Sequence, residues 1–283
     1  MKEMDGVEIG ALVLVVAAVV LALLHWERVE HWVEYLRHEP AASAPAAVAA
    51  SAAASAPAAV PAPPPPVLQV PAASSALPTL EHSDGEFGRA LASLLGRADF
   101  EHWWIADGLI VHVIATVDNL GRAQVPVHAW PLHTAPGSPR VDAHGDELLL
   151  DPANAQRYAP YMAMVRGVDA RALVAVYLRF YPLFQAAWRQ LGYPSGQFND
   201  RLLAVIDNLL AAPEPAGPLR LVQRHVLYQF ADPELEAASA GQKLLMRIGL
   251  ANEREVKARL RALRAELMRH MVTAAPRAAS GGG

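Results

Sequence analysis

The chain has 283 residues, a formal net charge of −4 and no cysteine. The small acidic excess argues against a nucleic-acid partner, because binding to phosphates requires clustered basic residues. The lack of cysteine excludes disulfides, thiol catalysis and thiolate metal ligands, but it does not distinguish a reducing from an oxidising compartment.

A short acidic tail (1–8) precedes an uncharged apolar run, "IGALVLVVAAVVLALLHW", at Ile9–Trp26. About 18 residues at about 1.5 Å rise reach about 27 Å, which is enough to cross the hydrocarbon core of a bilayer. A cleaved signal peptide would need a basic start and a nearby small-residue cleavage site. We therefore expect a single-pass transmembrane helix at 9–26, with the lipid bilayer as its partner. The helix can continue to residue 38.

Residues 39–77 are nearly all alanine, proline, serine and valine, and are expected to form a disordered linker. By the positive-inside rule, Lys2 before the apolar run and Arg28 and Arg37 after it are almost balanced or mildly favour the opposite orientation, with the N-terminus outside. Long domains translocate largely regardless of such charges. We therefore expect an inner-membrane protein of a Gram-negative bacterium with its C-terminal domain in the periplasm; display in the cytoplasm is the alternative.

Residues 78–273 have the helical periodicity of one globular, mainly helical domain, followed by a disordered tail at 274–283. Ser83 is a candidate cap for the first helix, and Asp169 or Val168 opens a long helix in which Pro182 predicts a kink. A small β-hairpin is expected in "PRVDAHGDELLL", with Gly145 in its turn. The other expected elements are helices at 102–120, 154–165, 198–210, 233–248 and 251–271, and a strand at 219–230.

Several motifs in one order resemble the bacterial family of domain of unknown function 3014. They are "LPTLEHSDGEF", "TVDNLGR", "LDPANAQRYAPYM", "FNDRLLAVIDNLLAAPEP", "YQFADPELE" and "GQKLLMRIGLANEREVKARLRALR", which together cover nearly all of 78–266. The resemblance implies a single-span envelope protein whose domain follows a flexible linker. It implies no reaction.

The carboxylates of the helix "FNDRLLAVIDNLL" are the first candidates for catalysis. Asp200 and Asp207 lie two turns apart, so their Cα atoms are separated by about 10.5 Å. Glycosidases place their carboxyl groups about 5 to 9.5 Å apart, and this spacing favours neither of their two geometries. Both aspartates also lie opposite or at the edge of the apolar arc of the helix, and Asn199 is a plausible N-cap. The solvated side of a packed helix is therefore the favoured interpretation.

Arginine, tyrosine and amide side chains are the candidates for binding a ligand or partner. Arginines can fork onto carboxylates of a partner or of the domain itself, and buried Arg–Asp pairs inside the domain are favoured. The tyrosines recur at roughly helical spacing, which is more typical of a core. The candidate binding residues are Asp118, Asn119, Arg122, Arg157, Tyr158, Asn199, Arg201 and Asp207.

The histidines and the last helix give weaker indications. His112, His128, His133 and His144 lie near acidic residues, but no HExxH pair or compact histidine spacing exists, so no metal is expected. Serine-hydrolase and nucleotide-binding motifs are absent too, so no cofactor is expected. Opposite charges such as Glu253 and Lys257 predict a solvated face on the last helix.

The sequence therefore favours a membrane-anchored periplasmic protein that binds or scaffolds in an envelope process, without catalysis of its own. Its partner would be an envelope protein or the cell wall. The alternative is an envelope hydrolase that acts on glycan or peptide through Asp118, Asp200 and Asp207.

Overall fold

The computed structural model describes residues 66–70, 76–124, 131–133, 139–224 and 227–273. The chain divides into two units, and the helical unit contains Val70–His270. The smaller unit contains strands β1 (Pro66–Leu68) and β6 (Met271–Thr273), which pair antiparallel with Val67 opposite Val272.

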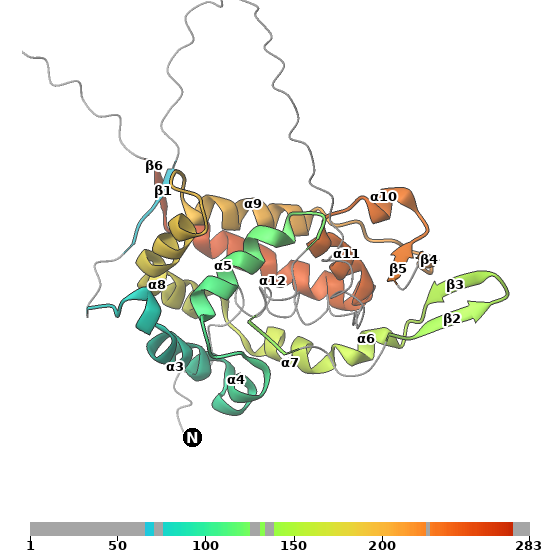
Figure 1. The fold of residues 1–283 in the computed structure, drawn as a ribbon, viewed down its shortest axis with the longest axis horizontal. Coiled ribbons are helices and arrows are strands. Elements are labelled where there is room, and N and C mark those ends of the chain that lie inside the picture. The colour runs from blue at the N-terminus through green and yellow to red at the C-terminus, as the bar shows by residue number, and fades with distance from the viewer. Residues whose placement is uncertain (1–65, 71–75, 125–130, 134–138, 225–226, 274–283) are drawn as a thin grey trace, which may run out of the picture. The chain divides into compact units, whose positions relative to one another are not determined.

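The helical unit begins with one 3-10 turn and continues through ten α-helices among its described residues (Figure 1). Their bounds are η1 (Leu80–His82), α3 (Asp84–Leu95), α4 (Arg97–Trp103), α5 (Leu109–Leu120), α6 (Asn154–Arg157), α7 (Ala159–Gly167), α8 (Ala170–Gln190), α9 (Phe198–Leu210), α10 (Pro233–Glu236), α11 (Ala240–Arg247) and α12 (Leu250–Arg269).

The core forms where α5 and α12 each pack against both α8 and α9. The apolar arc predicted for α9 is confirmed, since all five of its members are buried: Phe198, Leu202, Val205, Ile206 and Leu209. Aromatic rings fill the space beside α8, with Phe87 edge-on to Phe180 and Phe184 at centroid distances of 5.1 and 5.6 Å. Edge-to-face contacts of this kind stabilise a core beyond the area that they bury.

Several helix ends follow from local chemistry. Asp169 caps α8, because its side chain accepts hydrogen bonds from the backbone N–H groups of Arg171 and Ala172. The helix expected at 102–120 is instead interrupted between α4 and α5, where Gly108 has a φ of 61°. Asp84 of α3 then caps α5, accepting from the N–H groups of Gly108 and Leu109 at 2.8 and 2.9 Å.

A four-stranded antiparallel sheet has the order β2-β3-β4-β5. Its strands are β2 (Val141–His144), β3 (Glu147–Leu150), β4 (Arg220–Arg224) and β5 (Leu227–Phe230). The predicted hairpin is confirmed, because His144 pairs with Glu147 across a turn at Gly145 and Asp146. The sheet has a small core of its own, formed by Leu150, Leu221, Phe230 and Met246.

The fold class expected from the sequence needs correction. The structure supports a mostly helical domain with small sheets, and none of its described helices combines the length and the apolar character needed to cross a membrane. The span predicted at 9–26, the helix extension to 38 and the tail at 274–283 lie outside the described residues. Most of the linker expected at 39–77 lies outside them too, but its described part contains strand β1. The β-structure also exceeds one hairpin, because the region expected as one strand contains two, β4 and β5, which pair antiparallel, and β4 joins the first hairpin through Leu221 opposite Leu148.

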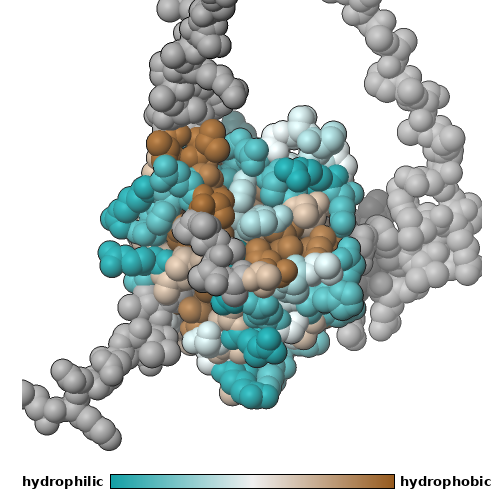
Figure 2. Space-filling view, turned by 90° about the vertical axis from the view of Figure 1, so that its left-hand side faces the viewer, coloured by the Kyte–Doolittle hydropathy of each residue, from teal (hydrophilic) through white to brown (hydrophobic). Residues whose placement is uncertain are grey.

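On the face drawn in Figure 2, brown hydrophobic residues gather in patches beside teal hydrophilic ones. Single exposed apolar side chains are ordinary on protein surfaces. Among the described residues, the most exposed large apolar side chains are Val67, Val111, Leu191, Met268 and Val272.

Candidate functional site

Asp118 lies in the last turn of α5, where it is buried and accepts hydrogen bonds on both carboxylate oxygens. Arg201 Nε donates to Oδ1 at 2.9 Å. Oδ2 accepts from Arg122 Nη2 at 2.6 Å and from the hydroxyl of Tyr193 at 2.9 Å. We call these four residues the Asp118 cluster. One carboxylate therefore joins the end of α5, the connection between α8 and α9, and α9 itself.

The sequence predicted internal Arg–Asp pairing, which is confirmed for Arg122 and Arg201. The negative charge of Asp118 raises the pKa of Arg122. Burial, and then the hydrogen bond with Asp118, raises the pKa of the Tyr193 hydroxyl. Both groups therefore keep their protons at neutral pH and act as donors.

The outer side of the Asp118 cluster is partly accessible. The side chain of Arg122 is 52% exposed, whereas that of Arg201 is 29% exposed. The ring of Tyr193 stacks on buried Trp188, with centroids 3.8 Å apart and ring planes inclined by 6°. The site thus combines a buried anion, an exposed guanidinium and an aromatic pair.

The two aspartates of α9 lie outside this cluster. Asp207 accepts from Arg264 Nε at 2.6 Å and from Nη2 at 3.2 Å, and both side chains are at least 40% exposed. Asp200 lies in the first turn of α9 and is exposed. The structure therefore places both on the solvated side of α9.

The amide candidates have structural contacts. Asn119 donates to the carbonyl of Ala115 one turn earlier in α5, at 2.7 Å. Asn199 is fully buried inside α9, and its Oδ1 accepts from the Tyr177 hydroxyl at 3.5 Å. The suggestion that Asn199 caps the helix is wrong, because the N-cap position belongs to Gln197.

A residue that the sequence did not single out caps α9 instead. The side-chain Oε1 of Gln185, which is buried in α8, accepts from the backbone N–H of Phe198 at 2.9 Å. Its Nε2 donates to the carbonyl of Gly196 at 3.0 Å. Thirteen residues separate Gln185 from Phe198, so no local capping pattern could reveal this contact.

Arg157 and Tyr158 belong to α6 and its C-cap. The Tyr158 side chain is buried, and the guanidinium carbon of Arg157 lies 5.7 Å from the centroid of its ring. This arrangement is typical of a cation–π contact. Burial raises the pKa of the Tyr158 hydroxyl.

The histidine candidates do not converge in the described part of the chain. No group of three or more histidine, aspartate or glutamate side chains there could hold a metal ion. His112 lies on α5, His133 is exposed, and His144 is exposed on β2. His128 lies outside the described residues.

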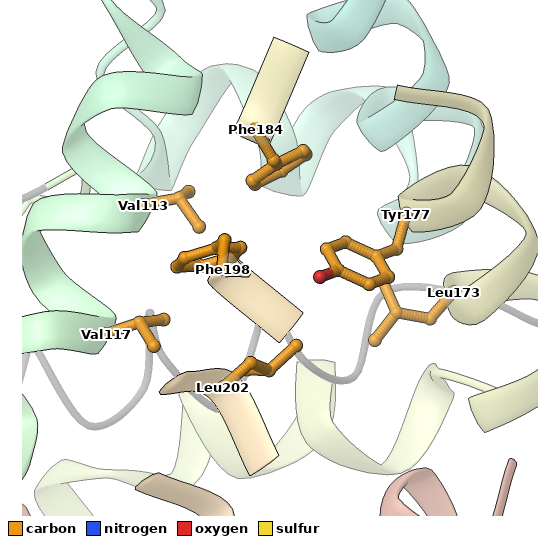
Figure 3. Close-up of a pocket in the computed structure, with 7 residues that line it drawn as sticks. All are labelled: Val113, Val117, Leu173, Tyr177, Phe184, Phe198 and Leu202. Atoms are coloured by element: carbon orange, nitrogen blue, oxygen red, sulfur yellow. The ribbon is translucent and has the colours of Figure 1, made fainter. Parts of the chain in front are cut away.

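A small apolar cavity of about 10 Å³ lies between α5, α8 and α9 (Figure 3). That volume is about what one water molecule needs, so the cavity is too small for a substrate. None of the candidate aspartates lines the cavity. Its lining residues are Val113, Val117, Leu173, Tyr177, Phe184, Phe198 and Leu202. Burial raises the pKa of Tyr177 well above its ordinary value, so its hydroxyl stays neutral.

The charged face expected on the last helix includes a buried pair. Lys257 and Glu253 of α12 are 2% and 1% exposed, and Lys257 Nζ lies 2.9 Å from Glu253 Oε1. Nζ also donates to the carbonyl of Ala212 at 2.6 Å and to Glu214 at 2.9 Å. The expected solvated face is therefore wrong for this pair, because Lys257 turns inward to hold the segment that follows α9.

Other residues of the motifs that resemble the family also hold the fold together. Asn154 receives a hydrogen bond from Arg140 N–H at 2.9 Å and donates to the Arg140 carbonyl at 2.6 Å, which ties α6 to the start of the first hairpin. Glu236 accepts from Phe230 N–H at 2.9 Å and from Lys243 Nζ at 3.0 Å. These polar groups join elements at the edge of the helical core.

Comparisons with known proteins agree with these motifs. The family described as "Protein of unknown function (DUF3014)" matches residues 109–264, more than half of the chain and the part that contains the Asp118 cluster and most of α12. Searches of curated proteins and of solved structures found no match. The chain belongs to the family of domain of unknown function 3014.

Proposed function

We propose that the helical unit is a non-catalytic binding or scaffolding module that serves a process of the bacterial envelope. One observation carries the proposal: both oxygens of Asp118 are already bound by Arg122, Arg201 and Tyr193. A general acid or base must be able to exchange a proton with the substrate. A carboxylate held by two guanidinium groups and a hydroxyl is suited to joining elements of a fold instead.

The positions of the other candidates support the same proposal. Asp207 is paired with Arg264 at the surface. The cavity between α5, α8 and α9 has an apolar lining apart from the Tyr177 hydroxyl. An active site usually gathers titratable groups of shifted pKa in a concave pocket.

The experiment is cross-linking of the full-length protein in living cells, followed by mass spectrometry of covalent neighbours. The proposal expects a reproducible protein neighbour that is lost when residues 76–270 are deleted. The opposing result is hydrolysis of wall glycan or peptide by the purified full chain, with loss of that activity in Asp118→Asn, Asp200→Asn or Asp207→Asn. That result would make the protein an envelope hydrolase.

The compartment belongs to the same proposal. We propose that the domain lies in the periplasm, because the linker at 39–77 is long and rich in alanine and proline and because the chain resembles envelope proteins. Alkaline phosphatase fused after residue 283 should then be active, whereas a fused fluorescent protein that matures only in the cytoplasm should stay dark. The reverse pattern would place the domain in the cytoplasm.

A further inference from the structure

We infer that the surface around Arg122 binds a carboxylate group on a segment of a partner protein. The inference rests on the proposed binding function and specifies the chemistry of the partner. We call this surface the Arg122 surface and define it by Arg122, Tyr193 and Arg201, with the buried Trp188 beneath the Tyr193 ring.

Arg122 has hydrogen-bond donors that the described part of the domain does not use. The guanidinium of Arg122 has five N–H donors, and both of its hydrogen bonds, to Asp118 and to Tyr193, are made by Nη2. The donors on Nε and Nη1 therefore have no hydrogen-bond acceptor among the described residues. Because the side chain is 52% exposed, these donors can reach a carboxylate that approaches from solvent.

The Asp118 cluster carries more positive than negative charge. The Asp118 cluster contains two guanidinium groups, of Arg122 and Arg201, and one carboxylate. One positive charge is therefore left uncompensated within the cluster. The hydrogen bonds of Arg122 to Asp118 and Tyr193 also fix the position of its guanidinium group. Less side-chain entropy is therefore lost when a partner binds.

An aromatic ring lies beside Arg122. Tyr193 donates to the same carboxylate and is held flat against Trp188 by stacking at 3.8 Å. Trp188 itself is buried, whereas Tyr193 is only partly buried, so the Tyr193 ring is the aromatic part that a partner can contact. Arginine, tyrosine and tryptophan are the residues enriched at energetically important positions of protein interfaces.

The combination of a cation and an aromatic ring held rigid by stacking favours a protein segment over a small anion. A free phosphate or acetate would use the guanidinium but would leave the Tyr193 ring without a partner. A protein segment with an acidic side chain beside an apolar one can use both. Wall fragments, whose carboxylates lie on short peptides, are the competing outcome of the test.

The test is selection of random heptapeptides, displayed on phage, against immobilised full-length protein. Peptides selected by the wild type should be enriched in aspartate or glutamate next to an apolar residue. The Kd of the best peptide, measured by calorimetry, should rise about tenfold or more in Arg122→Gln. The same change should follow when the acidic residue of the peptide is replaced by its amide, and the two replacements should not add in a double-mutant cycle.

Arg220→Gln is the matched control, because Arg220 is an exposed arginine paired with a glutamate on the sheet. It should leave the Kd unchanged. Tyr193→Phe, which keeps the stacked ring, serves as a second variant of the surface and should weaken binding less than Arg122→Gln. The inference is overturned if no acidic peptides are selected, if Arg122→Gln binds them as tightly as the wild type, or if only wall fragments bind. A covalent neighbour that persists in Arg122→Gln cells would leave the proposed function intact and remove only this surface.

Discussion

The role of Asp118 becomes clear in comparison with Asp207. Like Asp207, Asp118 is a helical aspartate whose carboxylate accepts from an arginine of another element. The difference is burial, because the side chain of Asp118 is 6% exposed whereas that of Asp207 is 50% exposed. Buried ion pairs are costly to break, and exposed ones contribute little.

Asp118→Asn should therefore lower the free energy of unfolding by about 2 to 3 kcal/mol, because it leaves Arg201 without its counter-charge. Asp207→Asn, the matched surface variant, should lower it by about 1 kcal/mol or less. Urea unfolding of the two full-length variants measures both values. Equal losses would show that burial does not distinguish the two pairs.

Glu214 gives a prediction about pH at the same scale. Hydrogen bonds from Arg254 and Lys257 lower its pKa to about 2. A carboxylate whose pKa is lowered by folding contributes stability above its unfolded pKa of about 4.5, and this contribution is lost as the pH falls through the folded value. The effect on the nearby buried Glu253 has the opposite sign, because burial raises its pKa.

Glu214→Gln should therefore destabilise the protein at pH 7, and the difference from the wild type should shrink between about pH 4.5 and pH 2. Glu253→Gln should cost less at pH 7 than Glu214→Gln, because it removes a charge that burial disfavours. Urea midpoints at several pH values measure both differences. A constant gap between Glu214→Gln and the wild type across this range would contradict the assignment.

At the scale of elements, α11 lies unusually close to α5 and α9. A Cβ atom at Gly241 of α11 would clash with Leu209 Cδ2 and would lie 3.1 Å from the carbonyl oxygen of Leu120. The Leu209 side chain can move, but the backbone of α5 cannot move without disturbing the end of that helix. The approach is reinforced by the N–H of Ala240, which donates to the Arg122 carbonyl at 2.7 Å.

Gly241→Ala should therefore destabilise the protein by about 1 to 3 kcal/mol through overpacking. Gly85→Ala in α3 is the matched control, because no atom lies within 4 Å of its added Cβ. It should be neutral or stabilising by up to about 1 kcal/mol. Thermal or urea unfolding distinguishes them, and a neutral Gly241→Ala would argue against the close packing of α11.

At the scale of the whole molecule, stability should be uneven. The buried faces of α5, α8 and α9 meet in the core, whereas Asp142, Ala143 and His144 of strand β2 are exposed. Regions with few buried contacts open locally at low free energy. The edge of the sheet should therefore open more readily than the helical core.

Hydrogen–deuterium exchange of the full chain should be slowest in peptides from α5, α8 and α9, and fastest, within the described part of the helical unit, in peptides that contain β2 and its turn. Mass spectrometry of peptic fragments measures this order. Protection of β2 equal to that of α8 would mean that another chain or segment pairs with the edge of the sheet.

Local chemistry was enough for the sequence to predict several features. The apolar arc of α9, the start of α8 at Asp169 or Val168 and a hairpin turn that contains Gly145 depend on residues only a few positions apart. The family was also evident, because its motifs are contiguous stretches of sequence. Periodicity, capping and turn chemistry need no knowledge of the tertiary structure.

Only the tertiary structure decided which distant residues meet. Arg201 reaches Asp118 from 83 positions away, and Lys257 reaches Ala212 from 45 positions away. The second hairpin joins the first into one sheet in the same way. Helix periodicity shows which face of an element is apolar, but a charged residue at the edge of that face is solvated or buried according to the neighbour that packs there. The burial of Lys257 and the place of Asp118 at the centre of a cluster therefore came from packing, which the pattern along one chain does not contain.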